Sequence, residues 1–274
     1  MNTSYVHGYD GREAIRLRDQ ADSLVELLHS DTAYARGEMI LEAGCGVGAQ
    51  TVTLARNSPG AAFTSIDVSA ESLAKAAAAV AALGAMNVTF RQADLFSLPF
   101  GDASFDHVFV CFVLEHLPDP AGALRALARV LKPGGTMTVI EGDHGSTYFH
   151  PESEFARRAV QCLVHLQAKG GGNALIGRTL YPLLTQAGFE GVAVSPRMVY
   201  VDASKPRLVE GFTRRTFTAM VEGVREPAIA QGLMSAAEFD RGIEDLYRTA
   251  HDDGVFCYTF FKAVGRAGGS NRVI

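Results

Sequence analysis

The sequence of 274 residues contains no tryptophan and only four cysteines, which are Cys45, Cys111, Cys162 and Cys257. No two of them have the Cys-x-x-Cys spacing of a zinc ribbon or a thioredoxin-type redox site, so the sequence argues against both classes of protein. Few, widely spaced cysteines are typical of a reducing compartment, and we therefore expect a cytoplasmic protein.

Long apolar runs are missing as well. Runs such as that from Val108 to Leu114 are far too short to cross a bilayer, so we expect no membrane span. The first ten residues include Asn2, His7 and Asp10 and no long apolar stretch, which is unlike a signal peptide.

An excess of basic residues is also absent. The chain has 25 Lys+Arg against 30 Asp+Glu and a formal net charge of -5, whereas a nucleic-acid-binding surface is normally basic. We expect no nucleic-acid partner. Asp143, His144 and His150 are close together in the sequence, but their spacing matches no specific metal site, and we expect no metal.

Short apolar runs do alternate with helical patterns through residue 142. The expected strands are about 38–43, 62–67, 87–93, 105–111 and 136–141. The expected helices are about 49–57, from Ser69 to near Gly84, and from Asp119 to near Leu131. This alternation predicts an α/β fold with a doubly wound parallel sheet.

Beyond residue 142 the alternation is less regular. Helices are expected at about 152–169, 178–187, 205–224 and 235–250, and strands at about 190–200 and 255–264. We therefore expect a helical segment at 1–35 over the functional site and a main domain at 36–265. The domain would contain lid insertions at about 143–176 and 202–252, and a flexible tail would follow at 266–274.

One segment carries the strongest functional signal. An apolar run ends in Glu42 and is followed by glycines at alternate positions, Gly44, Gly46 and Gly48. A buried strand that stops at a glycine turn leaves backbone N–H groups free and allows a ligand to approach closely. Because Glu42 repels a phosphate, the segment favours a nucleoside with a cationic part, such as S-adenosylmethionine.

The next strands also end in residues suited to such a ligand. Asp67 ends the second expected strand, where a carboxylate can accept both hydroxyls of a ribose. Asp94 follows the third, beside the apolar Leu95, and can accept from an adenine amino group. Cys111 ends the fourth, where its carbonyl could meet an α-amino group. In open parallel sheets, ligands bind at these carboxyl ends.

These residues, together with Leu131-Lys132-Pro133-Gly134-Gly135, resemble the class I S-adenosylmethionine-dependent methyltransferases. The resemblance is strong over roughly residues 36–142, and the Leu114-Glu115-His116-Leu117-Pro118 run resembles the branch that acts on small molecules. It implies a mainly parallel, Rossmann-like sheet of seven strands, the last one antiparallel. The expected cofactor-binding residues are Tyr9, Glu42, Gly44, Cys45, Gly46, Gln50, Asp67, Val68, Asp94, Leu95, Cys111 and His116. For the Tyr5–Tyr9 segment, a packing or dimer contact is an equal alternative.

Two other functions stay open. The pattern from Gly44 to Ala49 also satisfies a dinucleotide fingerprint, so an NAD-dependent oxidoreductase is one alternative. The second is a module that binds S-adenosylmethionine without catalysis, because no general base stands out.

The candidate catalytic residues are His144 and His116, each of which follows a strand whose end faces the expected methyl group. The position of His144 favours it over His116, which could instead hold the loop under the cofactor. Glu141 and Asp143 are further candidate bases. A structural role for each histidine is the simpler alternative. Methyl transfer from a sulfonium needs alignment above all, and a base only where the acceptor holds its proton tightly.

The insertions are rich in aromatic and aliphatic residues, which favours a lipophilic small molecule as methyl acceptor, at oxygen, nitrogen or carbon. Such acceptors are typical of secondary metabolism. The residues expected to contact the acceptor are Tyr5, His144, Tyr148 and Tyr200. A homo-oligomer remains open.

Overall fold

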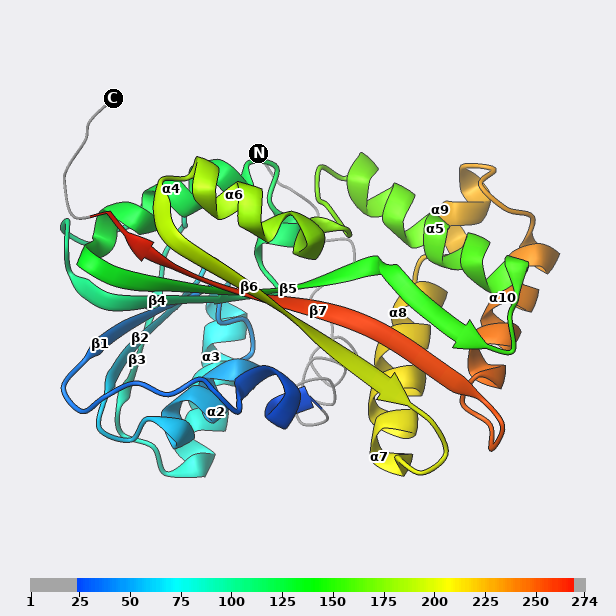
Figure 1. Ribbon diagram of the computed structural model, residues 1–274, viewed down its shortest axis with the longest axis horizontal. Helices are drawn as coiled ribbons and strands as arrows, with labels where there is room; N and C mark the ends of the chain where they lie inside the picture. Colours follow the sequence, from blue (N-terminus) through cyan, green and yellow to red (C-terminus); the bar gives the residue numbers. More distant parts are fainter. Residues whose placement is uncertain (1–23, 269–274) are drawn as a thin grey trace. The chain divides into compact units, whose positions relative to one another are not determined.

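The computed structural model describes residues 24–268. The chain divides into two compact units. Of the described residues, the first unit, here called the sheet unit, contains 28–141, 177–196 and 261–268. The second, the helical unit, contains 24–27, 142–176 and 197–260. Figure 1 shows the helices and strands of the chain with their labels.

Seven strands form one sheet in the order β3-β2-β1-β4-β5-β7-β6. Their bounds are β1 Met39–Ala43, β2 Ala62–Asp67, β3 Val88–Gln92, β4 Phe105–Cys111, β5 Leu131–His150, β6 Phe189–Val201 and β7 Val255–Ala267. The pairs β1–β2, β1–β4, β2–β3 and β4–β5 are parallel. β7 runs opposite to its neighbours β5 and β6 (Figure 1). The doubly wound, mainly parallel sheet of seven strands is therefore confirmed.

In the sheet unit, helices α2 (Ala49–Asn57) and α3 (Ala70–Leu83) lie on one face of the sheet, and α4 (Pro120–Val130) and α6 (Leu180–Gln186) lie on the other (Figure 1). The local signals place the helix ends where the sequence predicts them. Ser69 accepts a hydrogen bond from the Ser72 N–H at 3.1 Å, and Asp119 caps α4 ahead of Pro120. Consecutive apolar residues of the central strands are fully buried, Ile40 and Leu41 in β1 and Val108 to Val110 in β4, as expected for parallel strands covered by two helical layers.

The helical unit contains α5 (Glu154–Lys169), α7 (Pro206–Leu208), the π-helix η3 (Val209–Thr218), α8 (Ala219–Glu222), α9 (Arg225–Ala230) and α10 (Ala236–Arg248). Helix α5 packs along α10. The 3-10 helix η2 (Ile176–Thr179) joins the two units in the chain. The expected helix at 205–224 thus consists of three consecutive elements, and the middle one is a π-helix. Within it, the Thr216 hydroxyl donates to the Gly211 carbonyl at 2.7 Å.

Strand β5 is much longer than the expected 136–141, because it continues through His150. Residues 142–150 lack the apolar pattern of a buried strand, so tertiary contacts fix their conformation. The Ser146 hydroxyl accepts the Thr259 N–H at 3.0 Å, and a Cβ at Gly142 would lie only 2.2 Å from the Tyr258 hydroxyl oxygen. Only glycine allows β5 and β7 to approach this closely.

Aromatic rings fill the core of the helical unit. Phe212 and Phe217 of η3 contact the rings of Phe256 and Tyr258 from β7 at centroid distances between 4.8 and 6.0 Å. These side chains are at most 2% exposed. Most of the aromatic residues of the insertions therefore form the unit's own core.

Within the described residues, the helices are all too short or too polar to cross a membrane. Over the same range, no three His, Cys, Asp or Glu side chains gather closely enough to hold a metal ion.

Candidate functional site

The glycine loop after β1 is held by the neighbouring strand. The N–H groups of Gly44 and Cys45 both donate to the Ile66 carbonyl of β2, at 2.8 and 2.9 Å. Gly44 has φ 76°, and a Cβ added there would lie 2.5 Å from Val113 Cγ2. The loop therefore packs directly on the segment that follows β4, and the left-handed backbone and the lack of space both require glycine.

Asp67 joins this loop to the start of α3. Its Oδ2 accepts the Gly46 N–H and its Oδ1 accepts the Ser69 N–H, each at 2.9 Å. A carboxylate oxygen has two lone pairs, so both oxygens keep acceptor capacity for a ligand. A Cβ added at Gly46 would meet no described atom within 4 Å, so this glycine faces open space beside the Asp67 carboxylate.

Glu42 lies inside the fold and not on its surface. It is 2% exposed, and its Oε2 accepts the hydroxyls of Thr51 at 2.8 Å and Ser65 at 2.6 Å. Burial raises its pKa to about 7, against the two hydroxyl hydrogen bonds, which lower it. In this structure Glu42 ties α2 to β2 behind the glycine loop.

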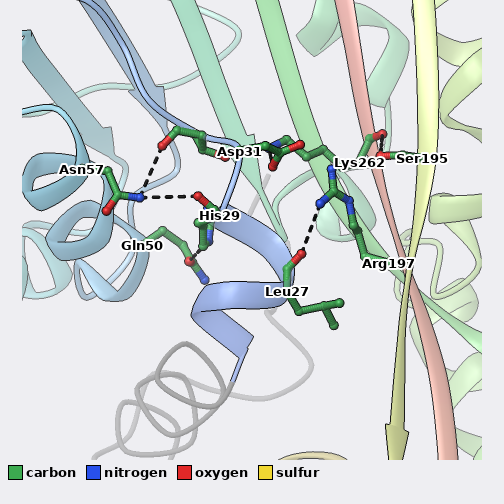
Figure 2. Close-up of polar contacts among 9 residues, drawn as sticks. Leu27, His29, Asp31, Gln50, Asn57, Ser195, Arg197 and Lys262 are labelled. Carbon is green, nitrogen blue, oxygen red and sulfur yellow. Dashed lines mark hydrogen bonds and ion pairs between the residues drawn. The ribbon is translucent and has the colours of Figure 1, made fainter.

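Gln50, in the first turn of α2, has a partner that the sequence did not indicate. Its Oε1 lies 2.6 Å from Nε2 of His29, a side chain that is 1% exposed (Figure 2). The Asn57 amide of the same helix donates to the carbonyls of His29 and Thr32 at 3.4 and 3.3 Å. Both helix positions thus hold the segment that precedes β1.

The last strand holds the same segment. The Lys262 ammonium of β7, 4% exposed, lies 2.6 Å from both Asp31 Oδ1 and Thr32 Oγ1 (Figure 2). In the helical unit, Arg197 donates to the Leu27 carbonyl at 3.4 Å. The chain before β1 is therefore fixed at several points.

Asp94 and its neighbours lie beyond β3. Asp94 is exposed, and its Oδ1 accepts the Phe96 N–H at 2.9 Å in a tight turn. Leu95 is 7% exposed, so most of its side chain is covered, whereas Val68 is 56% and Phe96 is 47% exposed. The exposed apolar surface beside the two acids is thus provided by Val68 and Phe96, and Phe96 was not among the sequence predictions.

The loop after β4 has an unusual backbone. Cys111 is buried, and Phe112 has φ 57°, which is uncommon for a residue other than glycine. Glu141 of β5 accepts the N–H groups of Val113 and Leu114 at 3.0 and 2.7 Å. His116 ends the 3-10 helix η1 (Leu114–His116), and its Nε2 lies 3.6 Å from Glu115 Oε1.

The predicted residues His144, Tyr148 and Tyr200 belong to the helical unit. His144 is 5% exposed, its Nδ1 lies 2.7 Å from the Tyr258 hydroxyl, and its ring meets Phe217 edge to face. Tyr148 and Tyr200 are 49% and 42% exposed. Tyr5 and Tyr9 lie outside the described residues.

The helical unit also contains an open cavity of about 490 Å³. Its lining residues are Glu154, Arg157, Arg158, Gln161, Cys162, His165, Leu233 and Met234. Two guanidinium groups and a carboxylate line it, so it does not suit a lipophilic acceptor.

The sheet unit therefore brings together the carboxyl ends of β1, β2, β3 and β4 with most of the predicted cofactor residues. Sequence reasoning missed the contacts of His29, Ser65 and Val113. A polar residue inside an apolar strand was the available signal for Ser65, but nothing in the sequence pairs His29 with Gln50 or Val113 with Gly44.

Comparison with known proteins agrees with this geometry. Residues 41–139 match the family model described as a methyltransferase domain. A 37.1 kDa protein of transposon TN4556 from Streptomyces fradiae is 36% identical over 197 residues, which cover 71% of this chain and 55% of that protein. The 27-O-demethylrifamycin SV methyltransferase of Amycolatopsis mediterranei is 33% identical over 134 residues, or 48% of this chain and 49% of that enzyme. The chain thus spans about half the length of these relatives.

Among solved structures, the phosphoethanolamine N-methyltransferase 2 of Haemonchus contortus in complex with S-adenosyl-L-methionine has a TM-score of 0.55 and 19% identity. The match covers 91% of this chain and 52% of that one, and at this identity it supports the fold alone. The family expected from the motifs is confirmed for the domain at residues 41–139.

Proposed function

We propose that this chain, whose residues 41–139 are a class I methyltransferase domain, transfers the methyl group of S-adenosylmethionine to a lipophilic small molecule. The observation that carries the proposal is the pairing of Asp67 with the Gly46 N–H, at the carboxyl ends of β1 and β2. A carboxylate that can accept from a ribose and a glycine that faces open space lie side by side there.

The residues of the sheet unit fit this cofactor. Asp67 keeps acceptor capacity for two ribose hydroxyls, and the exposed Asp94 carboxylate can accept from the adenine amino group. Val68 and Phe96 offer apolar surface to a flat ring. Gln50 and the N–H groups at the start of α2 would orient the methionine end, with Gln50 itself oriented by His29.

S-adenosylmethionine supplies a methyl group that is already activated as a sulfonium. The protein then has to align the acceptor with that group and exclude water. A base is required only where the acceptor loses a proton with difficulty.

Of the two candidate histidines, we favour His116 as the acid-base residue. It belongs to the same unit as the cofactor-binding residues, its side chain is 21% exposed, and the Glu115 carboxylate can orient it. His144 is the second candidate, and its burial and its contact with Tyr258 favour a positioning role instead.

The lipophilic class of the acceptor is inferred from two observations. The exposed Tyr148 and Tyr200 of the helical unit offer aromatic surface. The relative from Amycolatopsis is named for an acceptor of the rifamycin type. The acceptor atom, oxygen, nitrogen or carbon, stays open.

Titration calorimetry with S-adenosylmethionine, S-adenosylhomocysteine and NADH tests the cofactor. We expect binding of the first two and none of NADH, whereas preference for NADH would support an oxidoreductase. Incubation with a panel of phenols, amines and polyketides, followed by mass spectrometry, tests the transfer. A gain of about 14 Da, the mass difference between a methyl group and the proton it replaces, on any member supports the enzyme. Cofactor binding with no product from the panel would support the non-catalytic alternative.

A further inference from the structure

Glu141 has a buried carboxyl group to which the proposed methyl transfer assigns no role. The residue is 0% exposed and lies in β5 beside the end of β4. Its Oε1 accepts two consecutive backbone N–H groups, those of Val113 and Leu114. A single side-chain oxygen therefore anchors the first turn of the loop after β4.

The second oxygen of Glu141 is in a different situation. Oε2 is buried and has no hydrogen-bond partner among the described residues. If Glu141 were ionised, Oε2 would carry about half of the negative charge in the interior without a hydrogen-bond donor, which is costly. A neutral carboxyl group keeps the carbonyl oxygen for the two N–H groups and leaves an uncharged hydroxyl at Oε2, which costs less than an uncompensated charge.

The surrounding charges act in the same direction. Burial raises the pKa of Glu141 well above its usual range, and the nearby Glu115 carboxylate raises it further, while the backbone hydrogen bonds lower it. Among the described residues, the ionisable groups of this neighbourhood also include Cys111 of β4, Glu42 of β1, His116 of η1 and Lys262 of β7. The Lys262 ammonium is in contact with Asp31.

The anchored loop in turn contacts the glycine loop. The N–H of Val113 donates to Glu141, and the side chain of Val113 packs on Gly44. A Cβ added at Gly44 would lie only 2.5 Å from Val113 Cγ2. Phe112, one residue earlier, has the left-handed φ of 57°. Val113 therefore links Glu141 to Gly44, because Glu141 holds its backbone and its side chain contacts the glycine.

We propose that Glu141 is a positioning residue that, as the neutral acid, holds Val113 against the glycine loop and thereby sets the affinity for the cofactor. The choice of ligand for the test rests on the proposed function. Two substitutions distinguish the role of the hydrogen-bond acceptor from that of the ionisable group. Glu141→Gln keeps a carbonyl oxygen for the two N–H groups and cannot ionise, whereas Glu141→Met removes the acceptor.

The experiment measures the dissociation constant of S-adenosylhomocysteine by calorimetry between pH 6.5 and pH 9.5 for the wild type, both variants and Glu244→Gln. Glu244 is exposed on α10 and is the matched control for the amide substitution. At pH 7 we expect Glu141→Met to weaken binding by roughly tenfold or more, since two buried N–H groups lose their acceptor. Glu141→Gln should stay within about threefold of the wild type, since its carbonyl oxygen still accepts both bonds.

The pH profile distinguishes positioning by a neutral acid from simple packing. Wild-type affinity should fall toward alkaline pH as Glu141 ionises, and Glu141→Gln should flatten that fall while Glu244→Gln leaves it unchanged. Glu42 titrates in all four proteins, and burial raises the pKa of the Cys111 thiol well above its usual value, so only the difference between wild type and Glu141→Gln is assigned to Glu141. Wild-type affinity of Glu141→Met at pH 7, or an unchanged alkaline fall in Glu141→Gln, would overturn the proposal.

Two further outcomes remain decisive. If Glu141→Met does not fold, the profile of Glu141→Gln alone supports or overturns the proposal. If the wild type does not bind S-adenosylhomocysteine, the proposed function fails. The positioning is then tested by hydrogen exchange at the Val113 and Leu114 amides, which should be protected in the wild type and in Glu141→Gln and exposed in Glu141→Met. Equal protection in all three would overturn the positioning role.

Discussion

The Asp67 carboxylate accepts the Gly46 N–H at 2.9 Å, so the acid that ends β2 is hydrogen-bonded directly to the glycine loop that follows β1. The two residues are 21 positions apart in the sequence. Because the other oxygen of Asp67 accepts the Ser69 N–H, the carboxylate is oriented before any ligand binds. A preoriented acceptor loses less entropy when the ligand arrives.

Substitution of Asp67 should therefore affect both the ligand and the loop. We expect Asp67→Ala to weaken binding of S-adenosylmethionine by roughly 1–3 kcal/mol, because charge-assisted hydrogen bonds to the ribose are lost. Calorimetry measures the change, with the exposed Asp252→Ala as control. Unchanged affinity would mean that the ribose does not bind at Asp67.

Two glycines of the loop should respond differently to alanine. Gly44→Ala places a methyl group against Val113, so we expect a loss of stability of several kcal/mol. The added methyl group of Gly46→Ala meets no atom of the described residues within 4 Å, and we expect a cost of about 1–2 kcal/mol from the positive φ, together with a clear loss of cofactor affinity.

Urea unfolding and calorimetry measure the two effects separately. The double variant Gly44→Ala/Val113→Ala should recover part of the stability that Gly44→Ala loses, because the shorter side chain leaves room for the methyl group. No recovery would show that strain in the backbone, and not the contact with Val113, dominates.

Glu42 should make stability depend on pH. Its pKa is raised from 4.5 to about 7 by burial, so between these values the folded protein keeps a proton that the unfolded chain releases. The stabilisation from this group is complete below pH 4.5 and is lost as the pH rises toward 7. A shift of this size corresponds to about 3 kcal/mol.

Urea unfolding at pH values from 5 to 8 measures this effect. We expect the free energy of unfolding of the wild type to fall more steeply across this range than that of Glu42→Gln, which cannot ionise. Parallel profiles for the two proteins would show that Glu42 is charged in the folded state.

The pair formed by Lys262 and Asp31 should be asymmetric. The ammonium of Lys262 is buried, while the side chain of Asp31 is 52% exposed. Removing the anion leaves a buried charge with less compensation, so we expect Asp31→Ala to cost about 1–3 kcal/mol. Lys262→Met removes the charge and keeps the apolar stem, and we expect it to cost less than Asp31→Ala.

Thermal unfolding of both variants measures which of the two substitutions causes the larger loss of stability. A larger loss in Lys262→Met than in Asp31→Ala would contradict it and would show that the ion pair itself is strongly stabilising.

Much of the sheet unit was predictable because its signals are local. The bounds of α2, β2 and β4 match the expected ranges, since apolar runs, caps and glycines act within a few residues. The strand-end positions of Asp67 and Asp94 follow from the same patterns. The extension of β5 through His150 and the π-helix η3 were not predicted, because pairing with β7 and packing against its aromatic rings fix them.

The sequence by itself determined the order of strands and helices through residue 142, the glycine loop and the acids that follow the strands, since each depends on neighbouring residues. The tertiary structure alone decided which groups meet. It turned Glu42 inward toward Thr51 and Ser65, paired Gln50 with His29, and set Glu141 behind the loop that contacts Gly44. Hydrogen bonds between residues far apart in the sequence leave no periodic pattern, so only the folded chain reveals them.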